Sequence, residues 1–225
     1  MNEKTKLLLT AMTKGLIGCM LMGLLIFAPA GTLSYHGAWL LLGILFVPMT
    51  IMGIVMIIKS PDLLRRRLES KEQRNTQQGV IKLSGVIFIT GFIIAGLDYR
   101  CGWSDVPQWV TYGSALLFLF GYALYAEVMR ENVWLSRTVR VEEEQEVVTT
   151  GLYGIVRHPM YTATLLMFQA MPLVLGSWWA TLIFLLYIPI IVCRIVDEER
   201  LLRVELKGYN EYCSHLRWRL IPYIW

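Results

Sequence analysis

The sequence predicts an all-α integral membrane protein with about six transmembrane helices. Three observations predict this fold: the composition, the number of long apolar runs, and the side on which the basic residues fall. The 225 residues are 56% hydrophobic and 17% charged, and the mean hydropathy is +0.51. Soluble domains carry about 25% charged residues. The composition therefore excludes a disordered chain and is not that of an ordinary soluble enzyme.

Six apolar runs approach or reach the length of a membrane span. A helix needs about 20 mostly apolar residues to cross the hydrocarbon core. The runs cover residues 15–33, 37–58, 80–97, 108–128, 161–175 and 178–196. The fifth run is short for a complete crossing. Only Gly176 and Ser177 separate it from the sixth, so the last two runs are predicted to form a helical hairpin.

The basic residues fix the predicted topology, because Lys and Arg gather on the cytoplasmic side of membrane proteins. All of the 21 basic residues except Arg100 fall on one side of the six-span layout, among them Lys71, Arg137 and Arg140 in the inner loops. Both termini are therefore predicted to be cytoplasmic. This sorting also explains the basic inner surface, so nucleic acid is not expected as a partner.

The long polar stretches all lie on the predicted cytoplasmic side. They cover residues 59–79, 130–159 and 197–225, whereas the outer loops 31–36 and 104–107 are too short to hold a site. The chain is accordingly described as two regions, an N-terminal four-helix membrane region (1–130) and a C-terminal region with the hairpin and a cytoplasmic tail (131–225). A functional site is expected at the cytoplasmic face of the C-terminal region.

The first polar stretch contains a short amphipathic segment that starts at Pro61, a residue that suits the first turn of a helix. It is predicted to be an interfacial helix. Leu63, Leu64 and Leu68 would lie in the lipid boundary, and the arginines between them would face lipid headgroups.

The stretch from Val147 to Tyr161 has the pattern of a binding segment. Paired β-branched residues at 147–150 followed by Gly151 predict an extended segment that ends in a turn. Pro159 forces His158 out of the helical region and can start the fifth span. The free amide groups of that first turn could then meet a negative group. His158 and Tyr161 therefore become candidate binding residues.

Charged residues close the sixth apolar run. Arg194 and Glu198 are four residues apart and share one helix face. Charges at the end of an apolar helix cost free energy unless they are paired or functional. The two alternatives are a local ion pair that ends the helix and a pair that works in a site. The four cysteines and three histidines show no metal-ligand spacing, so no metal site is expected.

Several motifs, in this order and spacing, resemble the isoprenylcysteine carboxyl methyltransferase family, in particular its prokaryotic integral-membrane branch, which is related to the phospholipid N-methyltransferases. They are Gly151-Leu152-Tyr153, Arg157-His158-Pro159-Met160-Tyr161, Asp197-Glu198-Glu199 and the tail motifs Tyr209-Asn210-Glu211-Tyr212 and Arg219-Leu220-Ile221-Pro222. The chain departs from the family at Thr162, where a small residue is usual.

The resemblance implies an S-adenosylmethionine-dependent methyltransferase in a prokaryotic inner membrane, with a cytoplasmic cofactor pocket formed by the C-terminal half. It also implies a lipophilic small-molecule or lipidated acceptor drawn from the bilayer, surrounded by membrane lipids. Arg194 and Glu198 would be the catalytic residues, and Arg194 would face an acceptor carboxylate. The implied cofactor-binding residues are Gln145, Val147, Val148, Leu152, Tyr153, His158, Pro159, Tyr161 and Glu198.

Three alternatives stay open at this point. A phospholipid amine could be the acceptor instead of a carboxylate, with Glu199 or His158 taking the proton. Membrane sterol reductases share the Arg-His-Pro-x-Tyr motif but use NADPH, usually have more spans, and generally lack the paired glutamates. A non-catalytic membrane protein that keeps the pocket is the third alternative. The sequence leaves the oligomeric state open.

Overall fold

The computed structural model describes residues 3–68, 74–136, 138 and 141–225. These residues form helices, turns and irregular segments with no β-strand among them, which confirms the predicted all-α fold. Lys71, Arg137 and Arg140 lie outside this part of the chain. The helices are α1 (Glu3–Ala30), α2 (His36–Lys59), α3 (Pro61–Leu68), α4 (Asn75–Cys101), α5 (Gln108–Glu131), the 3₁₀ turn η1 (Gly151–Gly154), α6 (Pro159–Val174), α7 (Trp178–Leu185), α8 (Tyr187–Glu205) and α9 (Tyr209–His215).

Five helical stretches of the described residues are long and apolar enough to cross a membrane: α1, α2, α4, α5, and α7 together with α8. Helix α6, the fifth apolar run, has 16 residues and is shorter than the usual span, as the sequence predicts. The predicted set of about six spans is therefore five full-length spans and one short helix. The chain is an integral membrane protein.

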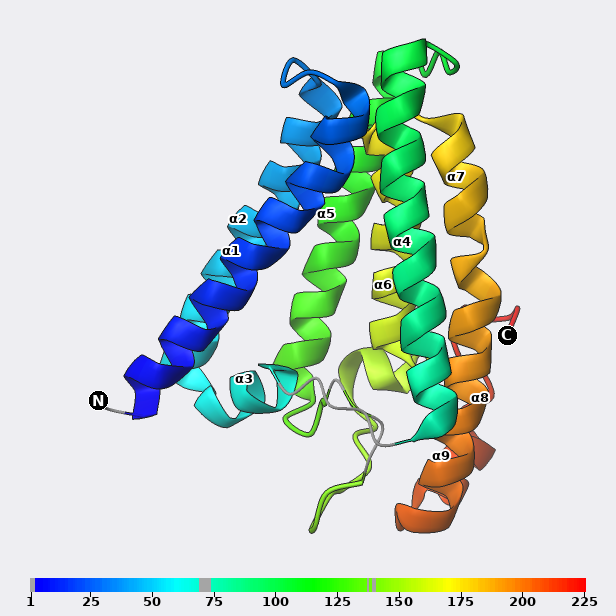
Figure 1. Cartoon of the computed structure of the whole chain (residues 1–225). Coiled ribbons are helices and arrows are strands. Elements are labelled where there is room, and N and C mark those ends of the chain that lie inside the picture. The colour runs from blue at the N-terminus through cyan, green and yellow to red at the C-terminus, as the bar shows by residue number, and fades with distance from the viewer. Residues whose placement is uncertain (1–2, 69–73, 137, 139–140) are drawn as a thin grey trace.

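The connections between the helices differ at the two ends of the bundle (Figure 1). Short loops join α1 to α2, α4 to α5 and α6 to α7 at one end. The opposite end carries the N-terminus, α3, the irregular segment between α5 and α6, and α9. We call this the polar end. It gathers the three polar stretches that the sequence predicts on one side of the membrane.

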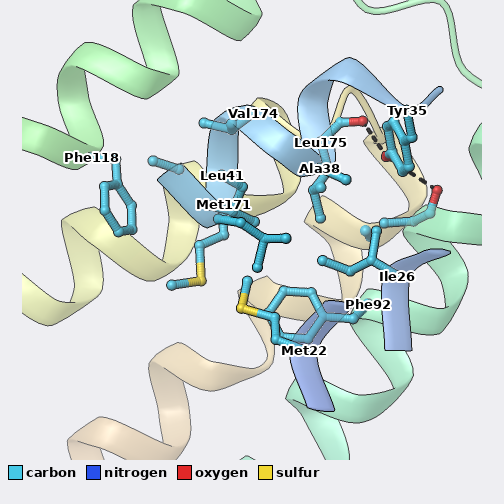
Figure 2. Close-up of a cluster of buried hydrophobic side chains, with 14 of the residues drawn as sticks. Met22, Ile26, Tyr35, Ala38, Leu41, Phe92, Phe118, Met171, Val174 and Leu175 are labelled. Carbon is cyan, nitrogen blue, oxygen red and sulfur yellow. Dashed lines mark hydrogen bonds between the residues drawn. The ribbon is translucent and has the colours of Figure 1, made fainter. Parts of the chain in front are cut away.

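The main hydrophobic core lies toward the short-loop end, where side chains from α1, α2, α4, α5, α6 and α7 meet. Figure 2 shows part of this cluster, including Met22, Ile26, Ala38, Leu41, Phe92, Phe118, Met171 and Val174. The Tyr35 hydroxyl is shared between the carbonyl oxygens of Leu175 and Ala95, the latter at 3.4 Å. It therefore ties the start of α2 to the end of α6 and to α4.

Toward the polar end, α1 and α2 leave this core. Residues 5–21 of α1 and 43–55 of α2 include no buried side chain. In Figure 1 the two helices diverge from the rest of the bundle in this direction. Leu7, Ala11 and Met52 in these parts still pack, partly buried, against a second cluster formed by α3, the end of α5 and their neighbours, and many of the other apolar side chains are exposed.

Helix α3 forms as predicted but in a different environment. Leu63 and Leu64 are buried against Val128 of α5 and its neighbours, not in the lipid boundary. Two of the three arginines face protein as well: Arg66 donates to the Val133 carbonyl at 2.7 Å, and Arg67 to the Tyr125 hydroxyl, whereas Arg65 is exposed. The prediction of a lipid-facing helix is wrong, because the irregular backbone after α5 offers carbonyls that need donors.

Close approach of α4 to α1 depends on Gly96. A Cβ atom there would lie 2.5 Å from the Ile26 carbonyl oxygen and 3.1 Å from the Ala30 nitrogen, and neither backbone atom can move aside easily. We expect Gly96→Ala to lower the free energy of unfolding by about 1–3 kcal/mol, measured by thermal unfolding in detergent. Gly85→Ala on the same helix is the control, because its Cβ would meet nothing within 4 Å. Equal stability of the two variants would contradict the close approach.

Candidate functional site

A cavity lies at the polar end, between the irregular segment after α5, η1, the start of α6, α8 and α9. It brings together most of the residues singled out from the sequence. The predicted site residues in its lining are Gln145, Val147, Val148, Tyr153, His158, Tyr161, Arg194 and Glu198. Leu152 and Pro159 do not line it. Leu152 packs against the α3–α5 cluster, and Pro159 is buried as the first residue of α6.

The part of the cavity wall that η1 forms needs a glycine at position 151, because no larger residue fits there. Gly151 has φ +52°, and a Cβ there would lie 1.6 Å from Glu131 Oε1. The same carboxylate accepts a hydrogen bond from the Leu152 amide at 3.0 Å. The segment 145–149 is not helical, and η1 supplies the turn that the sequence predicts.

Tyr153 is held in the cavity wall from two sides. Asn132 donates to the Tyr153 hydroxyl at 2.8 Å, and the Tyr212 hydroxyl donates to the Tyr153 carbonyl at 2.6 Å. Burial raises the pKa of Tyr153 and of Tyr212, so both phenols are neutral. Helix α9 and the end of α5 therefore fix this side of the site.

The start of α6 is paired with the C-terminal tail. The amides of Arg157 and His158 donate to the carbonyls of Trp218 and Arg219, both at 2.9 Å. His158 has a non-helical backbone and Pro159 follows in the first turn, as predicted. Thr162, the departure from the family pattern, donates its hydroxyl to the Leu220 carbonyl at 2.7 Å. This threonine therefore adds a link between α6 and the tail.

The three consecutive acids of α8 face three different surroundings. Asp197 accepts hydrogen bonds from Arg74 at 2.9 Å and from Gln77 at 2.6 Å, which ties α8 to α4. Glu198 lines the cavity, whereas Glu199 points away from it toward the tail. Only Glu198 is therefore available to a ligand.

Glu199 is the centre of a buried polar network, and its side chain is 4% exposed. One oxygen lies 2.8 Å from Arg157 Nη2 and 3.2 Å from His158 Nε2. The other accepts from Arg219 Nε at 3.0 Å, with Arg203 at 4.0 Å. The carboxylate is thus fully engaged by the protein. It holds the His158 segment in place and is poorly suited to take a proton from a substrate.

Glu198 has a different arrangement. Tyr161 donates its hydroxyl to Glu198 Oε2 and accepts a hydrogen bond from Arg194 Nε at 2.8 Å. The predicted Arg194–Glu198 pair is therefore joined through Tyr161. Within the described part of the chain, Glu198 forms no ion pair. Among the described residues, the Glu198 carboxylate is linked to a cation only through the Tyr161 hydroxyl, which suits it to a ligand that carries a positive charge.

Sequence reasoning placed Tyr209 and Tyr212 in a family motif but not in the site. Both line the cavity, as do Asn132, Trp134 and Met160. The spacing of three between the two tyrosines, which puts them on one face of α9, is the signal that could have indicated a shared wall. Tyr209 is 4% exposed, and its hydroxyl has no hydrogen-bond partner among the described residues.

The part of the chain that carries most of this cavity is similar to known membrane enzymes. Residues 109–206 match the phospholipid methyltransferase family. The match begins in α5 and ends at Leu206, so it includes every predicted site residue, while α9 and the tail lie beyond it. It supports the resemblance to membrane methyltransferases in the broad sense; the narrower isoprenylcysteine resemblance goes beyond it.

A second similarity is to a reductase. The Delta(14)-sterol reductase TM7SF2 of Mus musculus is 29% identical over 91 residues, which are 39% of this chain and 22% of the reductase. The chain therefore matches about a fifth of the length of that relative.

Proposed function

We propose that the chain transfers a methyl group from S-adenosylmethionine to a lipophilic acceptor in the membrane, and that the acceptor group is a carboxylate. The observation that carries the proposal is Glu198, a cavity carboxylate that forms no ion pair among the described residues. It lies within the stretch that matches the phospholipid methyltransferase family.

The cavity residues fit S-adenosylmethionine, which supplies an activated methyl group when bound. Glu198 would accept hydrogen bonds from its ammonium group. The non-helical segment with Gln145, Val147 and Val148 has backbone polar groups that no helix uses, so they can bind a ligand. His158 and Tyr153 would complete the walls. Leu152 and Pro159 would act indirectly, by holding the neighbouring Tyr153 and Tyr161.

The surroundings of Glu199 favour a carboxylate acceptor over an amine. A carboxylate is already ionised at neutral pH and needs no base. An amine acceptor would need one, and the two candidates, Glu199 and His158, are bound to each other at 3.2 Å. Arg194, which lines the cavity beside Tyr161, would orient the acceptor carboxylate. The work of the site is then alignment of two reactants.

An acceptor dissolved in the bilayer would reach the cavity from the membrane. The halves of α1 and α2 toward the polar end expose many apolar side chains, among them Leu16, Met20 and Ile54, which suits contact with lipid on this side of the bundle. The basic residues support a polar end that faces the cytosol, with both termini inside. We propose the prokaryotic inner membrane as the location on the family resemblance.

A reductase is the second candidate, because the Mus musculus sterol reductase is 29% identical over 91 residues. NADPH carries several phosphate charges and would need cations around it. Among the described residues the cavity lining holds two arginines: Arg157 is engaged by Glu199, and Arg194 is linked through Tyr161 to the Glu198 carboxylate, which itself opposes such a ligand. The charges of the site therefore favour S-adenosylmethionine.

The proposal is tested by ligand binding to the full chain in detergent, with S-adenosylmethionine and NADPH measured side by side. We expect micromolar binding of S-adenosylmethionine and at least tenfold weaker binding by Glu198→Gln, because a charge-assisted hydrogen bond is lost. Glu205→Gln, an exposed change on the same helix, should bind like the wild type. Binding of NADPH alone would favour the reductase, and binding of neither would reject both activities.

A further inference from the structure

The hydroxyl of Tyr209 is a buried polar group with no hydrogen-bond partner in the part of the chain that the structure describes. Three buried side-chain polar atoms have no hydrogen-bond partner among the described residues: Gln77 Oε1, Gln169 Oε1 and Tyr209 Oη. Both glutamines still donate through their amide nitrogens, to Asp197 and to the Phe184 carbonyl. Tyr209 has one polar atom, and of the three residues it alone lines the cavity. Because buried polar groups are nearly always hydrogen-bonded, this hydroxyl needs a partner.

The ring of Tyr209 is held by packing, and the hydroxyl oxygen on the ring is held with it. The ring packs in a cluster with Leu206, Tyr212 and Val147, and its centroid lies 5.9 Å from that of Tyr212. Tyr209 also begins α9, directly after Gly208, whose left-handed backbone sets the direction of the helix. The side chain is therefore held rigidly against the cavity, and the position of its hydroxyl is preorganised.

The Tyr209 hydroxyl is protonated and can donate a hydrogen bond to a ligand. Burial, with the Glu199 and Glu198 carboxylates nearby, raises the pKa of Tyr209, so the phenol keeps its proton. The Glu199 carboxylate is occupied by Arg157 and Arg219 among others. Tyr209 thus carries a neutral O–H group in a side chain that lines the cavity, and no described residue accepts a hydrogen bond from it.

We propose that Tyr209 is a cofactor-binding residue whose hydroxyl donates a hydrogen bond to the nucleoside part of S-adenosylmethionine, at a ribose oxygen or an adenine ring nitrogen. The inference rests on the function proposed above. The surroundings favour the nucleoside end of the ligand, because Tyr212, Leu206 and Val147 give this part of the cavity the apolar and aromatic character that suits a purine. The charged amino-acid end would then lie toward Glu198.

Tyr212 provides a matched control one turn further along α9. Its hydroxyl donates to the Tyr153 carbonyl at 2.6 Å and so has a structural role. Tyr212→Phe removes a hydrogen bond that the protein makes without a ligand. Tyr209→Phe removes a hydroxyl that costs stability in the unliganded protein, because it is buried without a partner.

The test measures ligand affinity and unliganded thermal stability of the full chain in detergent. The ligands are S-adenosylmethionine and 5′-methylthioadenosine, which keeps the nucleoside but lacks the amino-acid group. We expect Tyr209→Phe to bind both ligands about three- to tenfold more weakly, as for one lost hydrogen bond. Its unliganded melting temperature should equal or exceed that of the wild type, whereas that of Tyr212→Phe should fall. Glu198→Gln should weaken S-adenosylmethionine but not methylthioadenosine.

Two results would overturn the inference while leaving the proposed function intact. One is wild-type affinity of Tyr209→Phe for both ligands when the wild type binds S-adenosylmethionine. The other is a drop in unliganded melting temperature as large as that of Tyr212→Phe, which would make the hydroxyl structural. Failure of the wild-type protein to bind S-adenosylmethionine would instead reject the proposed function, and this inference with it.

Discussion

Glu199→Ala is expected to give the least stable variant of α8, with a loss of about 3–5 kcal/mol in the free energy of unfolding, as for a broken buried ion pair. The Glu199 side chain is 4% exposed, and Arg157 beside it is equally buried. Removing the carboxylate leaves the Arg157 guanidinium without its counter-charge and frees Arg219 from α8. The tail and the His158 segment then lose their common link to α8 and keep the backbone hydrogen bonds between them. Thermal unfolding in detergent measures the loss.

Glu205→Ala is the matched control for this change, because Glu205 is exposed near the end of the same helix. The network also predicts that a second substitution will restore part of the lost stability. Replacing Arg157 by methionine in the Glu199→Ala background removes the stranded buried charge, so the double variant should be more stable than Glu199→Ala alone. A loss below about 1 kcal/mol for Glu199→Ala, of the size typical of an exposed pair, would contradict the buried network.

The helices of this fold could be predicted because the signals are local. Apolar runs of membrane length mark α1, α2, α4 and α5, and Pro159 marks the start of α6. The environment of α3 could not be predicted. The pattern of Leu63 and Leu64 beside three arginines shows an amphipathic helix, but the same apolar face can meet lipid or protein. Here the hydrophobic cluster beside α5 and the carbonyls of Val133 and Ser136 place α3 against protein. Both features belong to parts of the chain that are distant in sequence, so the local pattern could not indicate them.

The sequence motifs could predict many of the residues that form the cavity, but not in which direction each side chain points. Glu198 and Glu199 are neighbours in the sequence, and about 100° of helix rotation separates them. That rotation puts Glu198 beside Tyr161 in the cavity and Glu199 against Arg157 and the tail. The unpaired Tyr209 hydroxyl is a property of packing between α8, α9 and the segment after α5. No pattern in the sequence distinguishes it from its bonded neighbour Tyr212.

Arg194→Ala is expected to lower the rate of methyl transfer while S-adenosylmethionine still binds. Arg194 lines the cavity and reaches Glu198 only through the Tyr161 hydroxyl. In the proposed reaction it orients the acceptor carboxylate, and a lost hydrogen bond to a charged group costs about 1.5–3 kcal/mol. The rate should therefore fall about 10- to 150-fold. Single-turnover transfer of a labelled methyl group to a membrane lipid extract, at saturating cofactor, measures it.

Substitutions of Glu198 and Arg194 should change different quantities in this assay. Glu198→Gln should lose cofactor affinity, and Arg194→Ala should lose transfer with affinity within about threefold of the wild type. Arg200→Ala, an exposed arginine on the same helix, controls for charge and should change neither quantity. Normal transfer by Arg194→Ala at saturating cofactor, together with weakened binding, would assign Arg194 to the cofactor instead. The acceptor would then have to be aligned by other side chains of the cavity, and an acceptor without a carboxylate would fit the site equally well.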